Sequence, residues 1–140
     1  VYDHLASGYT PKPVSHVLIY QTGLTHMDGL GNIGWLHGAL ADHLTSYGGK
    51  LDSPPGSWQM SILDWIESGA TASYGTVSEP YAMVEKFPDP TAISDGYLGG
   101  YTALEAYWQS VLWPLQGVFV GEPLAAPYAP LLQRMPKPYP

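Results

Sequence analysis

The stretch from Trp58 to Tyr81 constrains the fold more than any other part of the chain. Its first half spaces apolar residues three and four apart, which predicts a helix capped by Ser57 and stopped at Gly69. The small residues 70–75 that follow predict a buried strand to which helices can pack closely, and the polar residues 76–80 then leave it. This order is typical of an α/β sheet, whose ligand crevices lie at the carboxyl ends of its strands.

Two further runs predict buried strands, at residues 16–22 (HVLIYQT) and 117–121 (GVFVG). Both runs are almost continuously apolar, as expected for strands that are covered on both faces. We expect them to lie beside the strand at 70–75 in a mainly parallel sheet, the middle layer of a three-layer α/β sandwich.

The intervening segments predict helices. Apolar residues recur three and four apart over residues 34–47 and again over 102–113. Thr102 and Glu105 have the spacing of a capping box, and Pro114 ends that helix. Residues 91–98 predict a short helix. The inward face of the helix over 102–113 is expected to consist of Leu104, Tyr107, Trp108, Val111 and Leu112.

Prolines divide the chain into three parts. We predict an extended arm at 1–15, a single α/β domain at 16–122 and a proline-rich tail at 123–140. The six prolines of the tail exclude a central strand and favour an extended, polyproline II conformation.

Charged residues are scarce, at 12% of the chain, or about half the usual share. The net charge is −7, so the basic face that nucleic-acid binding needs is missing, and an anionic membrane surface is disfavoured. No apolar run is long enough to span a membrane. We interpret the shortage of charge as surface buried in a homo-oligomer or against other subunits of a larger assembly. The alternative is a compact domain rich in Gly, Ser, Thr and Tyr.

The chain contains no cysteine, which excludes disulfides, zinc thiolates and thiol catalysis. This absence does not fix the compartment, and we favour a secreted or cell-surface location. No signal peptide is visible, and the start at Val1 is compatible with a processed fragment of a longer precursor.

Two pairs of polar residues are candidates for chemistry. His26 and Asp28 lie in a glycine-flanked loop and could form an acid–base pair or half a metal site, or simply order the loop. We expect no metal there, because further ligands are not recognisable. Asp42 and His43 are adjacent on the predicted helix, point about 100° apart and so do not form one site. His43 is expected to be a core histidine.

A weaker hydrolase constellation would combine Ser73 or Ser78 with His26 and Glu79, although no G-x-S-x-G elbow is present. Glu79 and Glu122 each follow a predicted strand and precede a proline. If those strands are neighbours, the two carboxylates would share a crevice and have altered protonation. The alternative is that each glutamate caps a loop or a helix terminus.

Residues 29–34, GLGNIG, match the dinucleotide-binding pattern G-x-G-x-x-G between a predicted strand and a predicted helix. The strand ends at Thr22, however, which is several residues too early for the tight turn. The only acidic residue near the required distance is Asp52. We therefore expect no cofactor.

Several long motifs carry a family resemblance. They are GWLHGALADHLTSYGG, ESGATASYGTVSEPY, KFPDP and GYTALEAYWQSVLWPLQGVFVGEPLAAPYAP. Together they resemble the carboxyl-terminal part of a poorly characterised bacterial protein family over about residues 16–130, which implies no particular activity. The chain also resembles the caspase-like fold of gingipain-type peptidases, in which Gly121-Glu122-Pro123 would be the turn after the last strand.

The caspase-like resemblance implies a nucleophile near residues 22–25, and relatives in the bacterial family often have cysteine after the Glu-Pro pair, where this chain has Tyr81. Neither place holds a cysteine here, and the paired histidine strand of a caspase-like site would lie before residue 1. We therefore expect no cysteine-protease activity.

Two functions remain open. The first is a non-catalytic structural or assembly subunit built on a degenerate hydrolase-like α/β domain. It rests on the low charge, the many Tyr and Trp residues, the missing thiol and the proline-rich ends. In it, residues 1–15 and 123–140 would lie on neighbouring subunits or on a missing part of the precursor. The second is a hydrolase-like domain with a non-thiol site on the strand-end loops, completed by another segment or chain.

Overall fold

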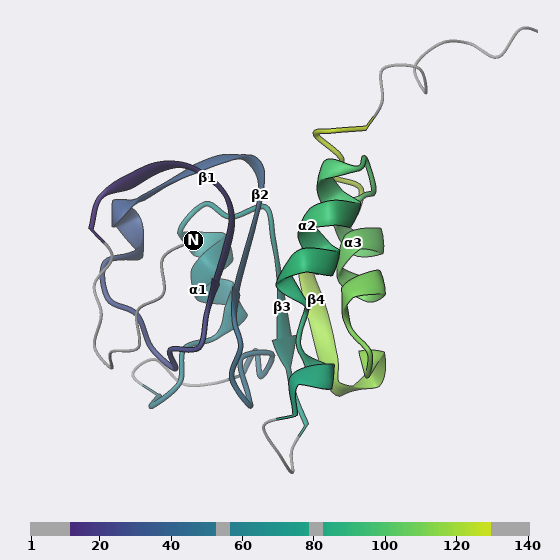
Figure 1. Ribbon diagram of the computed structural model, residues 1–140. Coiled ribbons are helices and arrows are strands. Elements are labelled where there is room, and N and C mark those ends of the chain that lie inside the picture. Colours follow the sequence, from purple (N-terminus) through teal and green to yellow (C-terminus); the bar gives the residue numbers. More distant parts are fainter. Residues whose placement is uncertain (1–11, 53–56, 79–82, 130–140) are drawn as a thin grey trace, which may run out of the picture.

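The computed structural model describes residues 12–52, 57–78 and 83–129, which form an α/β domain around a four-stranded sheet (Figure 1). The strands lie in sequence order: β1 (Val14–Thr22), β2 (Ile33–His43), β3 (Ala72–Thr76) and β4 (Gly117–Gly121). The first three are parallel, and β4 is antiparallel to β3. The prediction of an α/β fold with a mainly parallel sheet is thus confirmed.

The largest departure from the sequence prediction is β2, because residues 33–43 form a strand where a helix was expected over 34–47. Leu36 and Leu40 are four residues apart, a spacing that fits one face of a strand as well as one face of a helix. Since β2 pairs with β1 and β3 on its two edges, it separates two strands that were expected to be neighbours.

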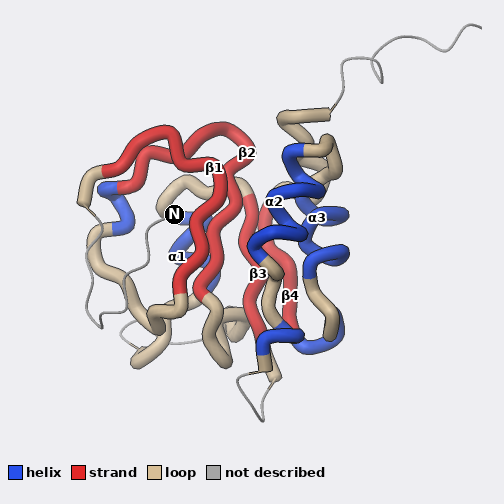
Figure 2. Tube along the Cα trace, in the orientation of Figure 1, coloured by secondary structure: helices blue, strands red, loops and turns tan. Residues whose placement is uncertain are grey.

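Helices cover both faces of this sheet (Figures 1 and 2). On one face, α1 (Ile62–Glu67) buries Ile62 and Trp65 in a core that includes Ala41 of β2. On the other face, α2 (Pro90–Leu98) and α3 (Ala103–Ser110) pack on a core that includes Leu40. Successive residues of β2 therefore face different cores, as the alternation of a strand requires.

The helix ends are set by their caps. Ser61, rather than Ser57, begins α1 through a capping box with Asp64, and Gly69 follows the helix with a φ of 109°, which favours glycine. The predicted capping box of Thr102 and Glu105 is confirmed at the start of α3. Three short 3₁₀ helices complete the described elements: η1 (Leu30–Asn32), η2 (Val84–Lys86) and η3 (Pro114–Gln116).

The inward face predicted for α3 is only partly correct. Tyr107 and Val111 are buried, whereas Trp108 and Leu112 are exposed. The helix ends at Ser110 instead of continuing to Trp113, so Leu112 no longer lies on the buried helical stripe. An apolar surface therefore remains at this end of α3.

Small residues allow a close approach at β3, as the sequence indicated. All five residues of β3 are buried. A Cβ atom added at Gly75 would lie 2.4 Å from the backbone nitrogen of Gly49 and 2.6 Å from a methyl carbon of Ile62. The close neighbours of this strand thus include the loop after β2 as well as α1.

The two terminal segments differ in part from the predicted arms. Because β1 begins at Val14, the expected arm 1–15 overlaps the first strand, and residues 1–11 lie outside the described part. Residues 123–129 pack on their own domain. Ala103 and Leu104 donate backbone hydrogen bonds to the carbonyls of Ala125 (2.8 Å) and Pro123 (3.2 Å). Residues 123–129 thus pack within the chain, whereas the sequence analysis placed 123–140 on a neighbouring subunit or on a missing part of the precursor; residues 130–140 lie outside the described ranges.

Candidate functional site

Polar side chains gather at the carboxyl edge of the parallel strands, where β1, β2 and β3 end at Thr22, His43 and Thr76. This is the edge at which open α/β sheets usually bind ligands. The Thr76 hydroxyl donates to the carbonyls of Thr45 (2.6 Å) and Ser46 (2.8 Å), and so fastens the loop after β2 to the end of β3.

Asp42 is a polar residue near this edge whose side chain is fully buried. Its Oδ1 accepts hydrogen bonds from the Tyr74 amide (2.8 Å), the Tyr107 hydroxyl (2.8 Å) and, at 3.4 Å, the Ser73 hydroxyl. Its Oδ2 accepts from Gln21 Nε2 at 3.1 Å. The carboxyl group therefore joins β1, β2, β3 and α3.

Burial raises the pKa of Asp42 to about 6, and this effect outweighs the hydrogen bonds from Tyr74, Gln21, Tyr107 and Ser73, which lower it. The two oxygens differ, because Oδ1 takes three donors and Oδ2 takes one. The buried Oε1 of Gln21 has no hydrogen-bond partner among the described residues. If Asp42 is protonated on Oδ2 and the Gln21 amide is rotated, the new O–H can donate to that oxygen.

His43 occupies the opposite face of β2. Its Nδ1 accepts from Trp65 Nε1 at 3.0 Å, and its Nε2 lies 2.7 Å from the Met60 carbonyl oxygen. These partners require the neutral tautomer that carries hydrogen on Nε2. Burial lowers the pKa of His43 to about 4. The prediction of a core histidine is confirmed. Asp42 and His43 do not form one site, although the reason is strand alternation rather than helical spacing.

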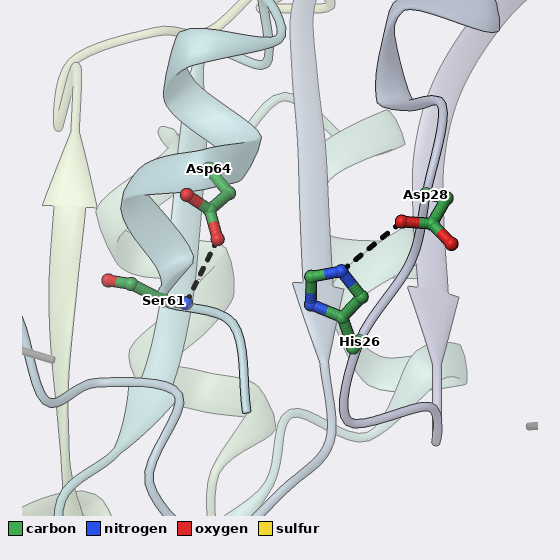
Figure 3. A network of polar contacts seen from close by, with 4 residues as sticks. All are labelled: His26, Asp28, Ser61 and Asp64. Atoms are coloured by element: carbon green, nitrogen blue, oxygen red, sulfur yellow. Dashed lines mark hydrogen bonds and ion pairs between the residues drawn. The ribbon is translucent and has the colours of Figure 1, made fainter. Parts of the chain in front are cut away.

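His26 and Asp28 do contact each other, as the loop sequence suggested. Their side chains point toward one another in Figure 3, with 3.3 Å between His26 Nε2 and Asp28 Oδ1. Both side chains are exposed, and the Ser61–Asp64 contact in the same view is the cap of α1. Within residues 12–52, 57–78 and 83–129, no group of three possible ligands gathers around this pair or elsewhere.

The sheet topology argues against the proposed pairing of Glu79 with Glu122. Because β4 is antiparallel to β3, Gly121 pairs with Ala72, and Glu122 leaves the sheet at the edge opposite Thr76. Glu122 is exposed, and its Oε1 accepts from the Leu124 amide at 3.0 Å, which is the loop-capping alternative. Glu79 itself lies outside the described residues.

The serine candidates lie in different environments. Ser73 is fully buried and donates to Asp42. Ser78 is half-buried on the loop after β3, and its carbonyl oxygen accepts from Lys86 Nζ at 3.1 Å. Lys86 is only 1% exposed, an unusual position for lysine, and the sequence analysis did not single it out. The sequence feature that could have indicated a buried lysine is the position of Lys86 as the only basic residue in a segment rich in apolar residues and proline.

The GLGNIG motif does not have the context of a dinucleotide site. It contains η1 and leads into β2, whereas the motif requires a following helix whose N-terminus faces the pyrophosphate.

An exposed apolar surface lies at the C-terminal end of α3, and we call it the α3-end patch. The Trp113 amide donates to the Glu85 carbonyl at 2.8 Å, which holds the segment around η2 against the segment before η3. Leu115 is 94% exposed, Val84 77% and Leu112 76%. The exposed residues of the patch are Met83, Val84, Trp108, Leu112, Trp113 and Leu115.

Comparisons of the chain with protein-family models, with curated proteins and with solved structures gave no match. The resemblances based on sequence motifs therefore stay predictions.

Proposed function

We propose that this chain is a non-catalytic structural or assembly subunit built on a hydrolase-like α/β domain, and that it self-associates. The observation that carries this proposal is the α3-end patch, which exposes two tryptophans and four aliphatic or thioether side chains. Large apolar side chains that gather on an exposed part of a protein often mark contact sites.

The composition of the patch supports a protein partner. Trp108 and Trp113 are of the residue type that is most enriched at the energetic centres of interfaces. The acidic, lysine-poor surface of this chain supports contact with another protein rather than with nucleic acid. A stable interface would bury about 800 Å² on each partner, so the patch would form its apolar centre and polar neighbours its rim.

The polar groups at the carboxyl edge support a structural role for that edge. Asp42 and His43 are at most 1% exposed, and each is held by hydrogen bonds to elements of the same domain. A parallel β1–β2–β3 sheet with helices on both faces is compatible with the caspase-like arrangement, which we keep as part of the proposal.

Sedimentation equilibrium tests this proposal. We expect wild-type protein to exceed its monomer mass of 15.2 kDa, and the double variant Leu112→Asp/Leu115→Asp to sediment as a monomer. Trp58→Asp is the control, matched in charge to the single variant Leu115→Asp, because it places one negative charge on an exposed apolar residue shortly before α1 and outside the patch. A wild-type protein that is monomeric at every concentration, or a control that dissociates as fully as the double variant, would contradict the proposal.

A second candidate function is favoured by one contact, that of the buried Lys86 Nζ with the Ser78 carbonyl. We propose, as the alternative, a hydrolase with Ser78 as nucleophile and Lys86 as base. In this scheme Ser78 Oγ bonds to a substrate carbonyl carbon, and its proton passes to Lys86 and then to the leaving group. Water then hydrolyses the ester and regenerates the serine.

A fluorophosphonate probe, which labels activated serine hydroxyls, separates the two functions. The hydrolase predicts labelling at Ser78 that is lost in Ser78→Ala and in Lys86→Met, but kept in the control Ser94→Ala on α2. Circular dichroism shows whether the Lys86→Met variant still folds. If this variant does not fold, the labelling of Ser78→Ala alone decides between the two functions. Absence of labelling in wild-type protein rejects the hydrolase and leaves the assembly proposal standing.

A further inference from the structure

We propose that the α3-end patch binds segment 130–140 of a second copy of this chain. This inference rests on the proposed function and names the partner of the patch. It makes the assembly head-to-tail, with one copy supplying the apolar surface and the next supplying a proline-rich peptide.

The chemistry of the segment fits the surface. Segment 130–140 reads PLLQRMPKPYP, with four prolines among eleven residues. Proline-rich peptides dock on surfaces that expose aromatic rings, because their fixed backbone angles reduce the entropy lost on binding. The α3-end patch exposes the rings of Trp108 and Trp113 with aliphatic side chains beside them. Leu131 and Leu132 of the segment supply apolar groups for such a surface.

Charge favours the same pairing. Segment 130–140 carries Arg134 and Lys137 and no acidic residue, so the preceding 129 residues hold all twelve acidic residues and only three basic ones. Beside the patch, Glu85 is half-buried and Asp89 is exposed. The last turn of α3 contains no basic residue, and the C-terminal end of a helix carries partial negative charge. The negative electrostatic potential at this end of α3 therefore attracts a basic peptide.

The opposite end of α3 shows how this chain covers a helix end with proline-containing backbone. Residues 123–129 include Pro123 and Pro127, and they bond to the amides of Ala103 and Leu104 at the first turn. The ring of Tyr128 packs edge-on against Tyr97 of α2, with 6.4 Å between the ring centres. The first turn of α3 is thus covered within the chain, whereas the α3-end patch stays exposed.

The proposed function requires contact between copies, so the occupant is the segment of a second copy. Residues 123–129 lie at the start of α3 and the patch lies at its end, about 12 Å away along an eight-residue helix. A segment of eleven extended residues spans about 34 Å and could also cover the patch of its own copy, but the chain would then stay monomeric. Contact with a second copy instead joins the segment of one molecule to the patch of the next. Such a heterologous contact repeats and gives rings or open chains.

Complementary full-length variants test the pairing. The patch variant Leu112→Asp/Leu115→Asp keeps a normal segment, and the segment variant Arg134→Glu/Lys137→Glu keeps a normal patch. Like charges facing across an interface cost several kcal/mol, so we expect the segment variant to associate about a hundredfold more weakly than wild type. Each variant alone should be monomeric, and an equal mixture should form a dimer and nothing larger, because only one functional interface remains.

The control mixes the patch variant with a chain that carries all four substitutions, and this mixture should stay monomeric. If the segment variant alone keeps the wild-type mass, segment 130–140 is not what binds the patch, although assembly through the patch is still supported. If both variants are monomeric but their mixture forms no dimer, docking between copies is wrong. If wild-type protein is monomeric, the assembly proposal itself fails. Leu115→Asp alone, at the most exposed patch position, replaces the double variant should that variant not fold.

Discussion

The carboxyl end of β2 and the α3-end patch use opposite residue types in opposite environments. At the end of β2, an ionisable carboxyl group and an imidazole are fully enclosed and hydrogen-bonded. At the end of α3, apolar side chains face solvent, and Leu115 has almost no cover. We infer that the buried polar groups fix the sheet of a single copy, whereas the exposed apolar groups serve contact between copies. Substitutions in the two regions should therefore change different measurements.

The largest effect is expected for Asp42→Ala. This change leaves the buried Tyr74 amide and Tyr107 hydroxyl without their acceptor, and each such loss costs about 1–3 kcal/mol. We expect the free energy of unfolding to fall by about 4 kcal/mol at pH 7, measured by urea denaturation.

Asp42→Asn is the matched control for this variant. Its carbonyl oxygen can replace Oδ1 as acceptor, and once the Gln21 amide is rotated its own amide can donate to the Oε1 of Gln21. The free energy of unfolding of Asp42→Asn should therefore fall by only about 1 kcal/mol. If the Asn and Ala variants were equally unstable, the hydrogen-bond account of Asp42 would be wrong.

The next effect is a pair of opposite pH dependences. The raised pKa of Asp42 means that its stabilising contribution is complete below pH 3.8 and is lost as the pH rises through about 6. The lowered pKa of His43 means that its contribution is complete above pH 6.5 and is lost as the pH falls through about 4. Each change amounts to about 3 kcal/mol, so the two contributions offset each other between pH 4 and 6.

Single variants should separate these two contributions. Relative to wild type, Asp42→Asn should lose stability as the pH falls from 6.5 to 4, because the His43 effect remains alone. His43→Asn should instead gain stability relative to wild type as the pH falls from 6 to 4. Urea denaturation across this range provides the measurement, and parallel pH profiles for the two variants would count against the assigned pKa shifts.

A smaller effect is expected for Trp65→Phe. The variant removes the indole N–H that donates to His43 Nδ1 and leaves a small cavity, so we expect a loss of about 2 kcal/mol. Trp35→Phe is the matched control, since the Trp35 indole is only half-buried and donates to Ser68. Equal losses for the two variants, measured by thermal or urea unfolding, would show that the His43 contact adds nothing.

The smallest effect on stability is expected for Leu115→Asp. Its side chain is exposed, so the unfolding free energy of a single copy should change by less than about 0.5 kcal/mol. The same variant should reduce the mass in solution. A large decrease in the unfolding free energy of dilute Leu115→Asp protein would show that Leu115 stabilises a single copy. The proposed difference between the end of β2 and the α3-end patch would then be wrong.

Sequence patterns predicted β1, β3, β4 and the capping box of α3, because those signals are local. The error at β2 arose because Leu36 and Leu40, four residues apart, fit one face of either structure, and only pairing with two neighbouring strands decides between them. Once β2 was read as a helix, the partners of Asp42 could not be found, since they come from three other elements. The patch was missed because α3 ends at Ser110, three residues before the expected end.

Hydroxyl-radical footprinting of the wild-type protein at low and high concentration tests the central claim most directly. The account predicts that oxidation of Trp113 and Leu115 decreases as the concentration rises, whereas oxidation of Trp58, which is 70% exposed beside α1, stays constant. Oxidation at Trp113 and Leu115 that does not change with concentration, while the mass in solution increases, would show that the copies meet through another surface.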